Sequence, residues 1–431
     1  MALTYSTMRP IDAGRRALAA ILFIGLTSCL SVPPTLVLPS LPLSDRAFQP
    51  TVEAATESPI TAGNTVDILL NGDQTFPAML EAIKSAQRTI TFETFIFRKG
   101  DIAEQFVKAF AERCRAGVEV KILLDGHGSR SVPSTYVERL QAAGCSVSMF
   151  RPMRPWAIDK SNYRDHRRVF VIDGRIAFTG GYAIDDLWAG DGRTKGRWRE
   201  TNVRITGPAV HQMQAAFVEH WLEATGTLLG GSGYFPEDDR VNRRGGTRAQ
   251  IVTSSPQRKD YGLYLLFLQA VAAAQRSIVI STPYLFPTSQ LGTILKDAAK
   301  RGVAISILIP SVTTDAGVEY VVQETHRELF DSLLGVGVKL YEYRPALLHT
   351  KMMVIDGAWA TVGSTNFDNR AMAINDELNI VVYDAAVASR LEATFAEDLT
   401  YARPLTRDSL KNRSWLGRII GKSTYPLKDQ F

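Results

Sequence analysis

The sequence predicts an α/β protein made of two consecutive repeats. Predicted helices alternate with short runs rich in Val, Ile and Leu, a pattern typical of strands buried on both faces of a sheet. The same succession of segments occurs twice: "RAGVEVKILLDG" from Arg115 corresponds to "KRGVAISILIPS" from Lys300, and "AGCSVSMFRP" corresponds to "VGVKLYEYRP". At 431 residues, 45% hydrophobic and 22% charged, the chain is long enough for two domains and is neither disordered nor a polytopic membrane protein.

Changes of composition along the chain predict six segments. A polar, basic start, an apolar run of ten residues and Cys29 come first, and a stretch rich in Pro, Ser and Thr follows. A Gly-rich, charged stretch separates the two repeats. We expect a signal peptide at 1–29, a tether at 30–63, a first repeat at 64–229, a linker at 230–248, a second repeat at 249–400 and a basic amphipathic tail at 401–431.

Three cysteines occur in the sequence. The tetrapeptide "LTSC" that ends at Cys29 resembles a bacterial lipobox, which predicts acylation of Cys29 and a lipid-anchored, membrane-associated protein of the cell envelope. An ordinary signal peptide or signal anchor is the alternative. Cys114 and Cys145 fall in a predicted helix and a predicted strand, where we expect two buried thiols, with a disulfide as the alternative.

A predicted hairpin late in the chain carries polar side chains along one edge. In "LHTKMMVIDGAWATVGSTN", His349 and Lys351 lie two residues apart and therefore project to the same side of a strand. Asp356 begins an Asp-Gly dipeptide of the kind that closes tight turns. The glycine before Ser364 lets the chain turn after the second strand, which places Ser364 and Asn366 beside the His/Lys pair.

An earlier hairpin, "DHRRVFVIDGRIAFTGG", repeats these offsets with His166, Arg168 and Asp173. A single strand histidine more often packs in a core than takes part in catalysis, and an Asp-Gly pair is usually only a turn. Two histidines at matched positions, each two residues before a cationic side chain, favour catalysis instead. Asp173 and Asp356 either support the site or only close their turns.

This pattern, His-x-Lys-x4-Asp followed by Gly-Gly or Gly-Ser, resembles the phospholipase D superfamily over roughly residues 66–401. The segments "GSTNFDNRA" and "GPAVHQMQAAFVEHWLEATG" are most similar to its bacterial cardiolipin synthase branch. The resemblance implies two phospholipase D-like α/β/α repeats packed around a shared active-site cleft. It also implies that Glu377 and, in the first half, Glu200 are carboxylates that orient the histidines, because such a partner fixes the imidazole tautomer.

Opening a phosphodiester requires a nucleophile, an acid for the leaving alkoxide and donors for the phosphate oxygens. We expect His166 and His349 to share the first two roles through a phosphohistidine intermediate. The scheme uses no metal and no other cofactor, and the sequence shows no His/Cys/carboxylate cluster with metal-ligand spacing. The phosphate is expected to be bound by Arg168, Lys351, Ser364 and Asn366.

The first copy departs from the family pattern at two positions. Arg168 stands where lysine is usual, and Ala183 stands where the second copy has Asn366. Arginine keeps the positive charge but presents a planar fork in place of a compact ammonium group. Either Arg168 is a tolerated variant, or the first site binds phosphate without completing catalysis.

The leading hypothesis is a phosphatidyltransferase similar to cardiolipin synthase, in which a phospholipid donates a phosphatidyl group to His166 and a second lipid or other alcohol accepts it. The alternative is a phospholipase D-type hydrolase that acts on lipid or, less in keeping with the sequence, on nucleic acid. A non-catalytic lipid-binding protein is a third hypothesis. The formal charge of +5 favours anionic partners. We expect phospholipid substrates and a membrane surface as partners, and no nucleic acid, because aromatic residues are not interleaved with Lys and Arg.

Three apolar segments are expected near the mouth of the site or at a membrane. One is the run "GGYAIDDLW" of the first copy, which ends at Trp188. The first copy carries an insertion, "MRPWAIDKSNYRD", which contains Trp156. Near the C-terminus, Trp415 and Ile419 lie at helical spacing among basic residues in "SLKNRSWLGRIIGKS". This stretch predicts either a helix at an anionic membrane surface or a terminal helix packed on its own domain.

Overall fold

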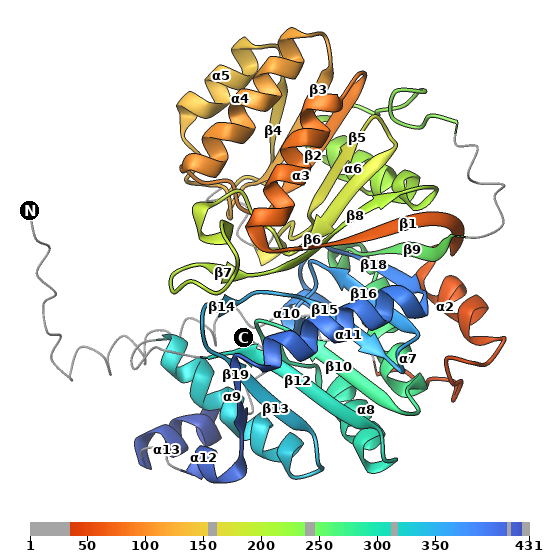
Figure 1. Ribbon diagram of the computed structural model, residues 1–431, viewed down its shortest axis with the longest axis vertical. Coiled ribbons are helices and arrows are strands. Elements are labelled where there is room, and N and C mark those ends of the chain that lie inside the picture. Colours follow the sequence, from red (N-terminus) through yellow and green to blue (C-terminus); the bar gives the residue numbers. More distant parts are fainter. Residues whose placement is uncertain (1–34, 154–161, 238–245, 312–317, 412–414, 425–431) are drawn as a thin grey trace, which may run out of the picture.

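The computed structural model describes residues 35–153, 162–237, 246–311, 318–411 and 415–424 (Figure 1). Its first half contains four strands joined by three helices, then a hairpin, a two-residue strand and a closing strand and helix. In chain order these elements are β1 (Thr61–Leu70), α3 (Asn71–Ser85), β2 (Thr89–Thr94), α4 (Asp101–Arg115), β3 (Glu119–Asp125), α5 (Ser134–Ala142), β4 (Ser146–Phe150), β5 (Val169–Ile172), β6 (Ile176–Gly180), η2 (Asp186–Trp188), β7 (Trp198–Arg199), β8 (Thr201–Thr206) and α6 (Ala209–Thr225).

The second half repeats this order and adds short strands near the junction of the halves. Its elements are β9 (Thr247–Ser254), η4 (Pro256–Arg258), α7 (Gly262–Ala273), β10 (Ser277–Ser281), β11 (Leu285–Phe286), α8 (Ser289–Lys300), β12 (Ala304–Pro310), α9 (Val318–Leu334), β13 (Lys339–Tyr343), β14 (Leu347–Leu348), β15 (Met352–Ile355), β16 (Trp359–Gly363), β17 (Phe367–Asp368), α10 (Asn369–Ala373), β18 (Glu377–Tyr383) and α11 (Ala385–Leu399).

A single 15-stranded sheet passes through both halves in the order β19-β13-β12-β10-β15-β16-β18-β9-β1-β8-β6-β5-β2-β3-β4, where β19 is Ala402–Leu405. The order is nearly the same when read from either end toward the middle. Three parallel strands lie in the outer part of each half, with the antiparallel strand β19 added at one edge. An antiparallel hairpin follows in each half, and the halves meet where β1 pairs antiparallel with β9. The predicted two-repeat α/β architecture is therefore confirmed.

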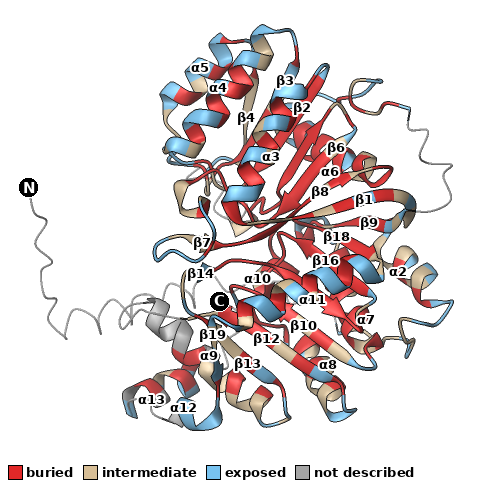
Figure 2. Ribbon diagram, viewed as in Figure 1, coloured by how far each residue is buried: buried red, intermediate tan, exposed pale blue. Residues whose placement is uncertain are grey.

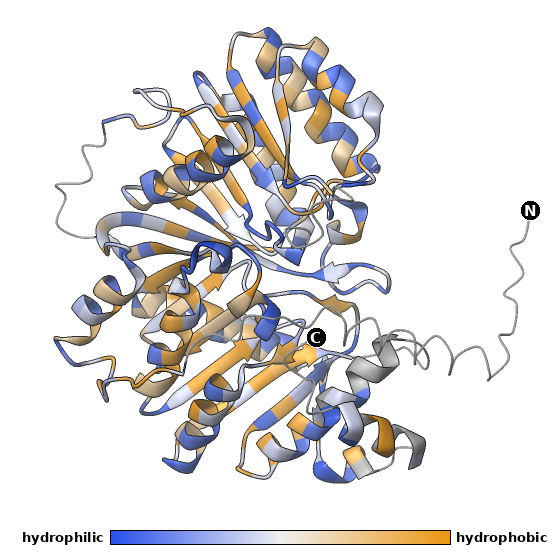
Figure 3. Cartoon of the chain, turned by 180° about the vertical axis from the view of Figure 1, so that it is seen from behind, coloured by the Kyte–Doolittle hydropathy of each residue, from blue (hydrophilic) through white to orange (hydrophobic). Residues whose placement is uncertain are grey.

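The central strands are buried on both faces, as their apolar sequences predict. Every residue of β2, β5, β15 and β16 is buried. Helices flank the sheet and expose only their outward surfaces (Figure 2). Seen from behind, hydrophobic residues gather along the strands, and hydrophilic residues mark the outer helices and connections (Figure 3).

Both Asp-Gly dipeptides close tight hairpins. Asp173 and Gly174, between β5 and β6, have φ angles of 51° and 61°, and Asp356 and Gly357, between β15 and β16, have φ angles of 54° and 62°. Two successive residues in the left-handed region are characteristic of the turn that matches the twist of paired strands. The two hairpins consequently have the same local geometry.

Part of the segment expected to be a tether, 30–63, forms regular structure. Residues Phe48–Thr56 form helix α2, which packs on α7, and β1 begins at Thr61. Phe48 and Val52 lie one helical turn apart and are buried. The Pro-rich and Ser-rich composition of the preceding residues indicated a loop, so this helical spacing of apolar residues was missed. The signal peptide and Cys29 lie outside the described residues.

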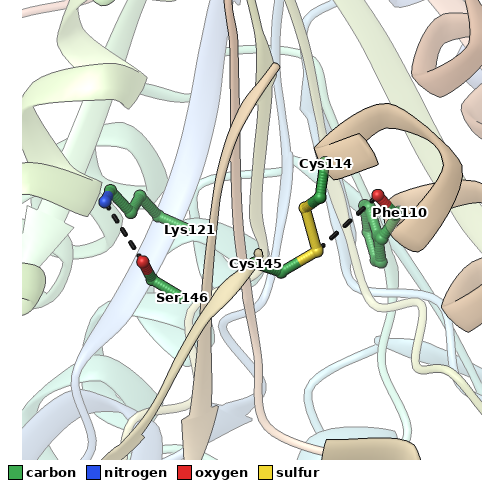
Figure 4. Close-up of a disulfide and its surroundings, with 5 residues drawn as sticks. All are labelled: Phe110, Cys114, Lys121, Cys145 and Ser146. Atoms are coloured by element: carbon green, nitrogen blue, oxygen red, sulfur yellow. Dashed lines mark hydrogen bonds between the residues drawn. A yellow bond between two sulfur atoms is a disulfide. The ribbon is translucent and has the colours of Figure 1, made fainter. Parts of the chain in front are cut away.

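The expectation of two separate thiols is also wrong, because Cys114 and Cys145 form a disulfide (Figure 4). Cys114 lies in the last turn of α4, and Cys145 lies directly before β4. Their Cα atoms are 5.5 Å apart, within the range that a disulfide spans. The sequence gave no sign of this proximity, which depends on α4 packing on α5 and β3.

The C-terminal tail contains β19, α12 (Arg407–Lys411) and α13 (Trp415–Thr424). Helix α13 packs on α9, and the hydroxyls of Thr424 and Thr325 are 2.5 Å apart. The tail therefore packs on its own domain, yet Trp415 is 71% exposed and Ile419 is 53% exposed. Among the described residues, no helix has both the length and the apolar character needed to cross a membrane.

Candidate active site

The two predicted histidines lie in extended segments directly before the two hairpins. His166 precedes β5, and His349 lies between β14 and β15. Each backbone amide is held by the opposite half: His166 N donates to the carbonyl of Asp376 at 2.9 Å, and His349 N donates to that of Arg199 at 2.8 Å. Each histidine is only 8% exposed. These bonds fix both imidazoles at the junction of the halves.

Each imidazole is hydrogen-bonded to a glutamate from the opposite half. His166 Nδ1 lies 2.8 Å from Glu377 Oε1 and 3.0 Å from Oε2, and His349 Nδ1 lies 2.6 Å from Glu200 Oε2. Each glutamate directly follows the residue whose carbonyl holds the histidine backbone. Both predicted carboxylates are thus beside a histidine, in a crossed arrangement.

The two predicted cations fold back on the histidines that precede them. Lys351 Nζ lies 2.9 Å from Nδ1 and 3.0 Å from Nε2 of His349, and it donates to the carbonyl of that residue at 2.6 Å. Arg168 Nη1 donates to the carbonyl of His166, and its Nε donates to that of Tyr182 at 3.2 Å. Both cationic side chains are almost fully buried. The site therefore concentrates positive charge away from water.

Ser364 and Asn366 follow the second hairpin but have different surroundings. The Ser364 hydroxyl donates to Glu377 Oε2, so in this structure it orients a carboxylate. Asn366 is 7% exposed, and within the described part of the chain its Oδ1 has no hydrogen-bond partner. Gly181 and Ala183 occupy the corresponding positions of the first half. Only the second half presents an amide side chain at this position.

The turn aspartates contact backbone amides rather than the histidines or the cations. Asp173 accepts the amides of residues 87–89, and Asp356 accepts those of residues 275–277, at distances of 2.7–2.9 Å. These bonds tie each hairpin to the start of β2 or β10. Of the two alternatives considered for these residues, the geometry favours turn closure.

Burial is the main influence on the protonation of this site. It lowers the pKa of His166 and His349 well below the usual range, and the neighbouring cations lower both further. Burial also raises the pKa of Glu200 to about 7, raises that of Glu377 well above its usual value, and lowers that of Lys351 to about 7. Neutral imidazoles are favoured, and Lys351 is poised to change its charge near neutral pH.

Aromatic side chains surround the histidines, and the motif did not single them out. The ring centroids of Trp188 and Trp198 lie 5.2 Å and 4.7 Å from that of His349, and Phe95 lies 5.1 Å from His166. Trp188 Nε1 also lies 3.4 Å from Glu200 Oε2. The run "GGYAIDDLW", which begins with the Gly-Gly of the first half and ends at Trp188, was the available signal.

The insertion of the first half reaches the second half at its end. Arg370, in α10, donates to the side-chain oxygen of Asn162 at 3.0 Å and to its carbonyl at 2.9 Å. Residues 154–161, including Trp156, lie outside the described residues. The structure thus places only the C-terminal end of this insertion, at Asn162, beside the second half.

Within the described residues, one group of three side chains has ligand atoms that all lie within 4.8 Å of one another: Glu93, Asp165 and His220. All three are fully buried. His220 Nδ1 lies 2.6 Å from Glu93 Oε1, the length of a hydrogen bond, and the positive charge of Arg167 acts on Glu93. We therefore assign this group to hydrogen bonding rather than to a bound cation.

Comparisons with known proteins agree with this geometry. Residues 79–221 and 267–399 match the family described as "Cardiolipin synthase, PLD-like domain". A cardiolipin synthase of Geobacillus sp. (strain WCH70) is 34% identical over 366 residues, which cover 84% of this chain and 72% of the relative. Cardiolipin synthase 1 of Bacillus cereus is 30% identical over 391 residues, covering 88% of this chain and 76% of the relative.

Solved structures share the fold at low sequence identity. The phosphatidylserine synthase of Haemophilus influenzae superposes with a TM-score of 0.68 at 13% identity, covering 89% of this chain and 98% of that one. The polyphosphate kinase of Porphyromonas gingivalis gives a TM-score of 0.53 at 11% identity, covering 93% of this chain and 57% of that one. From the two matched ranges and the identity to curated relatives, the chain belongs to the cardiolipin synthase family of PLD-like proteins.

Proposed function

We propose that this protein is a phosphatidyltransferase that acts on phospholipids through a phosphohistidine and forms cardiolipin. The observation that carries the proposal is the pair of buried histidines, each bound at Nδ1 by a carboxylate from the opposite half. A carboxylate at Nδ1 directs the basic lone pair to Nε2, the ring nitrogen that reacts. The relatives named above are cardiolipin synthases, which favours transfer to a lipid alcohol over hydrolysis.

We assign His166 as the nucleophile. Its Nε2 makes no hydrogen bond within the described part of the chain, whereas both ring nitrogens of His349 contact the Lys351 ammonium. His166 Nε2 attacks phosphorus, and the bond from phosphorus to the head-group oxygen breaks. His349, whose protonated form is favoured once the anionic phosphate is bound, gives its Nε2 proton to the leaving alcohol. His349 then removes a proton from the acceptor hydroxyl, whose oxygen attacks phosphorus while the N–P bond breaks and frees His166.

The buried cations stabilise the charge that develops on the phosphate oxygens. Arg168 and Lys351 lie on opposite halves of the site, and Asn366 adds an amide on one side only. Enclosure strengthens each of these interactions, because fewer water molecules compete for the phosphate. An anionic substrate also favours the charged form of Lys351, whose pKa is lowered to about 7 by burial.

Membrane attachment is part of this proposal. Cys29 provides the acylated anchor, and the exposed Trp415 and Ile419 of α13, with the exposed Lys422 in its last turn, rest on an anionic lipid surface. A single acyl chain binds a membrane weakly, so a second contact strengthens the attachment. Mass spectrometry of the purified protein should find an acylated N-terminal peptide that begins at Cys29. A mature terminus well downstream of it would contradict the anchor.

Product analysis tests the reaction. Vesicles of phosphatidylglycerol, with and without phosphatidylethanolamine, are incubated with the full-length protein, and the lipid products are quantified by mass spectrometry. We expect more cardiolipin than phosphatidic acid, undiminished by a chelator, and no product from His166→Ala. Mainly phosphatidic acid would assign the protein as a hydrolase, and cleavage of DNA without lipid turnover would contradict both lipid activities.

A further inference from the structure

A buried histidine on α6 lies beneath the His166 half and was not part of the predicted site. His220 is fully buried, and its ring is stacked at 4.4 Å on that of Phe150. Its Nδ1 lies 2.6 Å from Glu93 Oε1 and 3.7 Å from Asp165 Oδ1, and its Nε2 lies 3.6 Å from Asp376 Oδ2. One imidazole therefore faces three carboxylates from three separate parts of the chain.

Two of these carboxylates belong to the residues that precede the site pair. Asp165 comes directly before His166, and Asp376 comes directly before Glu377. The two aspartates form a parallel β-bridge, and Asp376 accepts the backbone amide of His166 through its carbonyl at 2.9 Å. His220 thus contacts both peptide segments whose separation sets the hydrogen bond between His166 and Glu377.

The surroundings hold these segments firmly. Arg151 Nη1 lies 2.8 Å from Asp376 Oδ2, and the backbone amide of Arg167 donates to Asp165 Oδ1 at 3.0 Å. Nε2 of His220 nevertheless lacks a hydrogen-bond partner among the described residues, and Asp376 Oδ2 lies 3.6 Å from it. A buried polar atom without a partner is costly, so a bridge from the ring to Asp376 has a strong driving force.

In the His349 half, the helix equivalent to α6 makes a different contact with the segment before Glu200. Asp398, near the end of α11, lies 2.9 Å from Nε of Arg199, the residue directly before Glu200. Leu348 stands where the first half has Asp165, and Ser281 stands where it has Glu93. An arginine–aspartate ion pair supports one half, whereas an imidazole among carboxyl groups supports the other.

We propose that His220 is a positioning residue that joins the two halves under the nucleophile and holds His166 against Glu377. The role is selective: His220 supports the His166 half, and Asp398 supports the His349 half. A small displacement of a reacting group is enough to reduce the rate by about 10²-fold. Loss of the bridge should therefore lower kcat, and KM should stay nearly unchanged because the phosphate-binding cations are untouched.

Three substitutions separate the contacts of His220. The amide of His220→Gln reaches the position of Nε2 and can still donate to Asp376, whereas the shorter amide of His220→Asn reaches only the Nδ1 side. His220→Leu loses both contacts. We expect His220→Gln to keep kcat within about tenfold of the wild type and His220→Leu to lose about 10²-fold, with His220→Asn nearer to His220→Leu. His211→Asn, on the same helix, is the matched control and should behave as wild type.

The kinetic result rests on the proposed function, so a second measurement is independent of it. In protein labelled with ¹⁵N-histidine, the Nδ1–H signals of His166 and His349 are assigned from the two alanine variants. His220→Asn should shift or broaden the His166 signal and leave that of His349 in place. Asp398→Asn should do the reverse.

Several outcomes would overturn the proposal. Equal changes in both signals, or in neither, would show that His220 does not act selectively on His166. A fall in kcat that follows the folded fraction in thermal melts, with no advantage for His220→Gln, would reduce the residue to a packing role. If Zn²⁺ or Mn²⁺ raised the melting temperature of the wild type but not of His220→Asn, the group would be a metal site instead.

Discussion

The two halves of the site share a backbone framework and differ in the side chains that complete it. In each half an Asp-Gly hairpin follows the histidine, and a strand from the opposite half supplies both a carbonyl for the histidine backbone and a glutamate for its ring. The side chains differ at two equivalent positions. The first half has Arg168 where the second has Lys351, and it has Ala183 where the second has Asn366. A repeated framework therefore carries two chemically distinct sites.

This difference indicates how the work is divided. The His349 half holds an ammonium whose charge varies near neutral pH, and the rings of Trp188 and Trp198 lie beside the imidazole of His349. The His166 half holds a permanently charged guanidinium and leaves Nε2 of its histidine without a hydrogen bond in the described structure. A fixed cation suits the residue that forms the covalent bond, and a variable proton suits the residue that exchanges protons.

The largest expected effect is common to both halves. His166→Ala and His349→Ala should each lower head-group release from phosphatidylglycerol by at least about 10³-fold, because each histidine acts in both half-reactions. Thermal melting should show that both variants remain folded. A tenth of the wild-type rate in either variant would show that one half is dispensable and would break the proposed division of roles.

The crossed carboxylates give the next effect. Glu377→Gln and Glu200→Gln should each lower kcat by about 10²-fold, because an amide no longer favours the reactive tautomer. Each signal in the ¹⁵N-histidine spectrum reports which ring has lost its partner. Glu377→Gln should move the His166 signal, and Glu200→Gln should move the His349 signal. The opposite pattern would contradict the crossing.

The two cations should differ in their pH dependence. Lys351 carries its charge below about pH 7 and loses it as the pH rises, because burial lowers its pKa to about 7. The kcat/KM value of the wild type should therefore fall above about pH 7, by up to tenfold per pH unit. Lys351→Arg should move this fall in kcat/KM to higher pH, because arginine stays protonated throughout. Arg168→Lys serves as the control. If kcat/KM of Lys351→Arg fell at the same pH as that of the wild type, the fall would belong to another titrating group.

The smallest effect on activity concerns a bond that only the first half contains. Cys114 and Cys145 are joined across a sequence separation of 31, far from the histidines in the chain. Replacing both with serine should lower the free energy of unfolding by about 3–4 kcal/mol, because the unfolded chain gains loop entropy. Urea denaturation measures this loss, and kcat should stay within about twofold. A large fall in kcat at full folding would show that the disulfide also shapes the site.

Local features were readable from the sequence. Short apolar runs between the predicted helices predicted the strands of both halves. The offsets found in the His349 hairpin identified the matching hairpin of His166, Arg168 and Asp173. The turns at Asp173 and Asp356 followed from the Asp-Gly dipeptide itself. These predictions succeed because a strand period or a two-residue turn depends on neighbours along the chain.

Features that join distant segments were not readable. Helix α2 follows a Pro-rich stretch, and the disulfide requires α4 to pack on α5 and β3. Ser364 contacts Glu377. His220 had no signal in the motif at all. Each depends on which segments meet after folding, and periodicity carries no information about that.

The sequence by itself determined the two-repeat α/β fold and the set of polar residues at the end of each repeat. Only the tertiary structure decided that His166 is paired with Glu377 and His349 with Glu200. The physical reason is the antiparallel pairing of β1 with β9, which joins the halves in opposite directions. Each glutamate is thereby directed toward the histidine of the other half, so neither repeat completes a site alone.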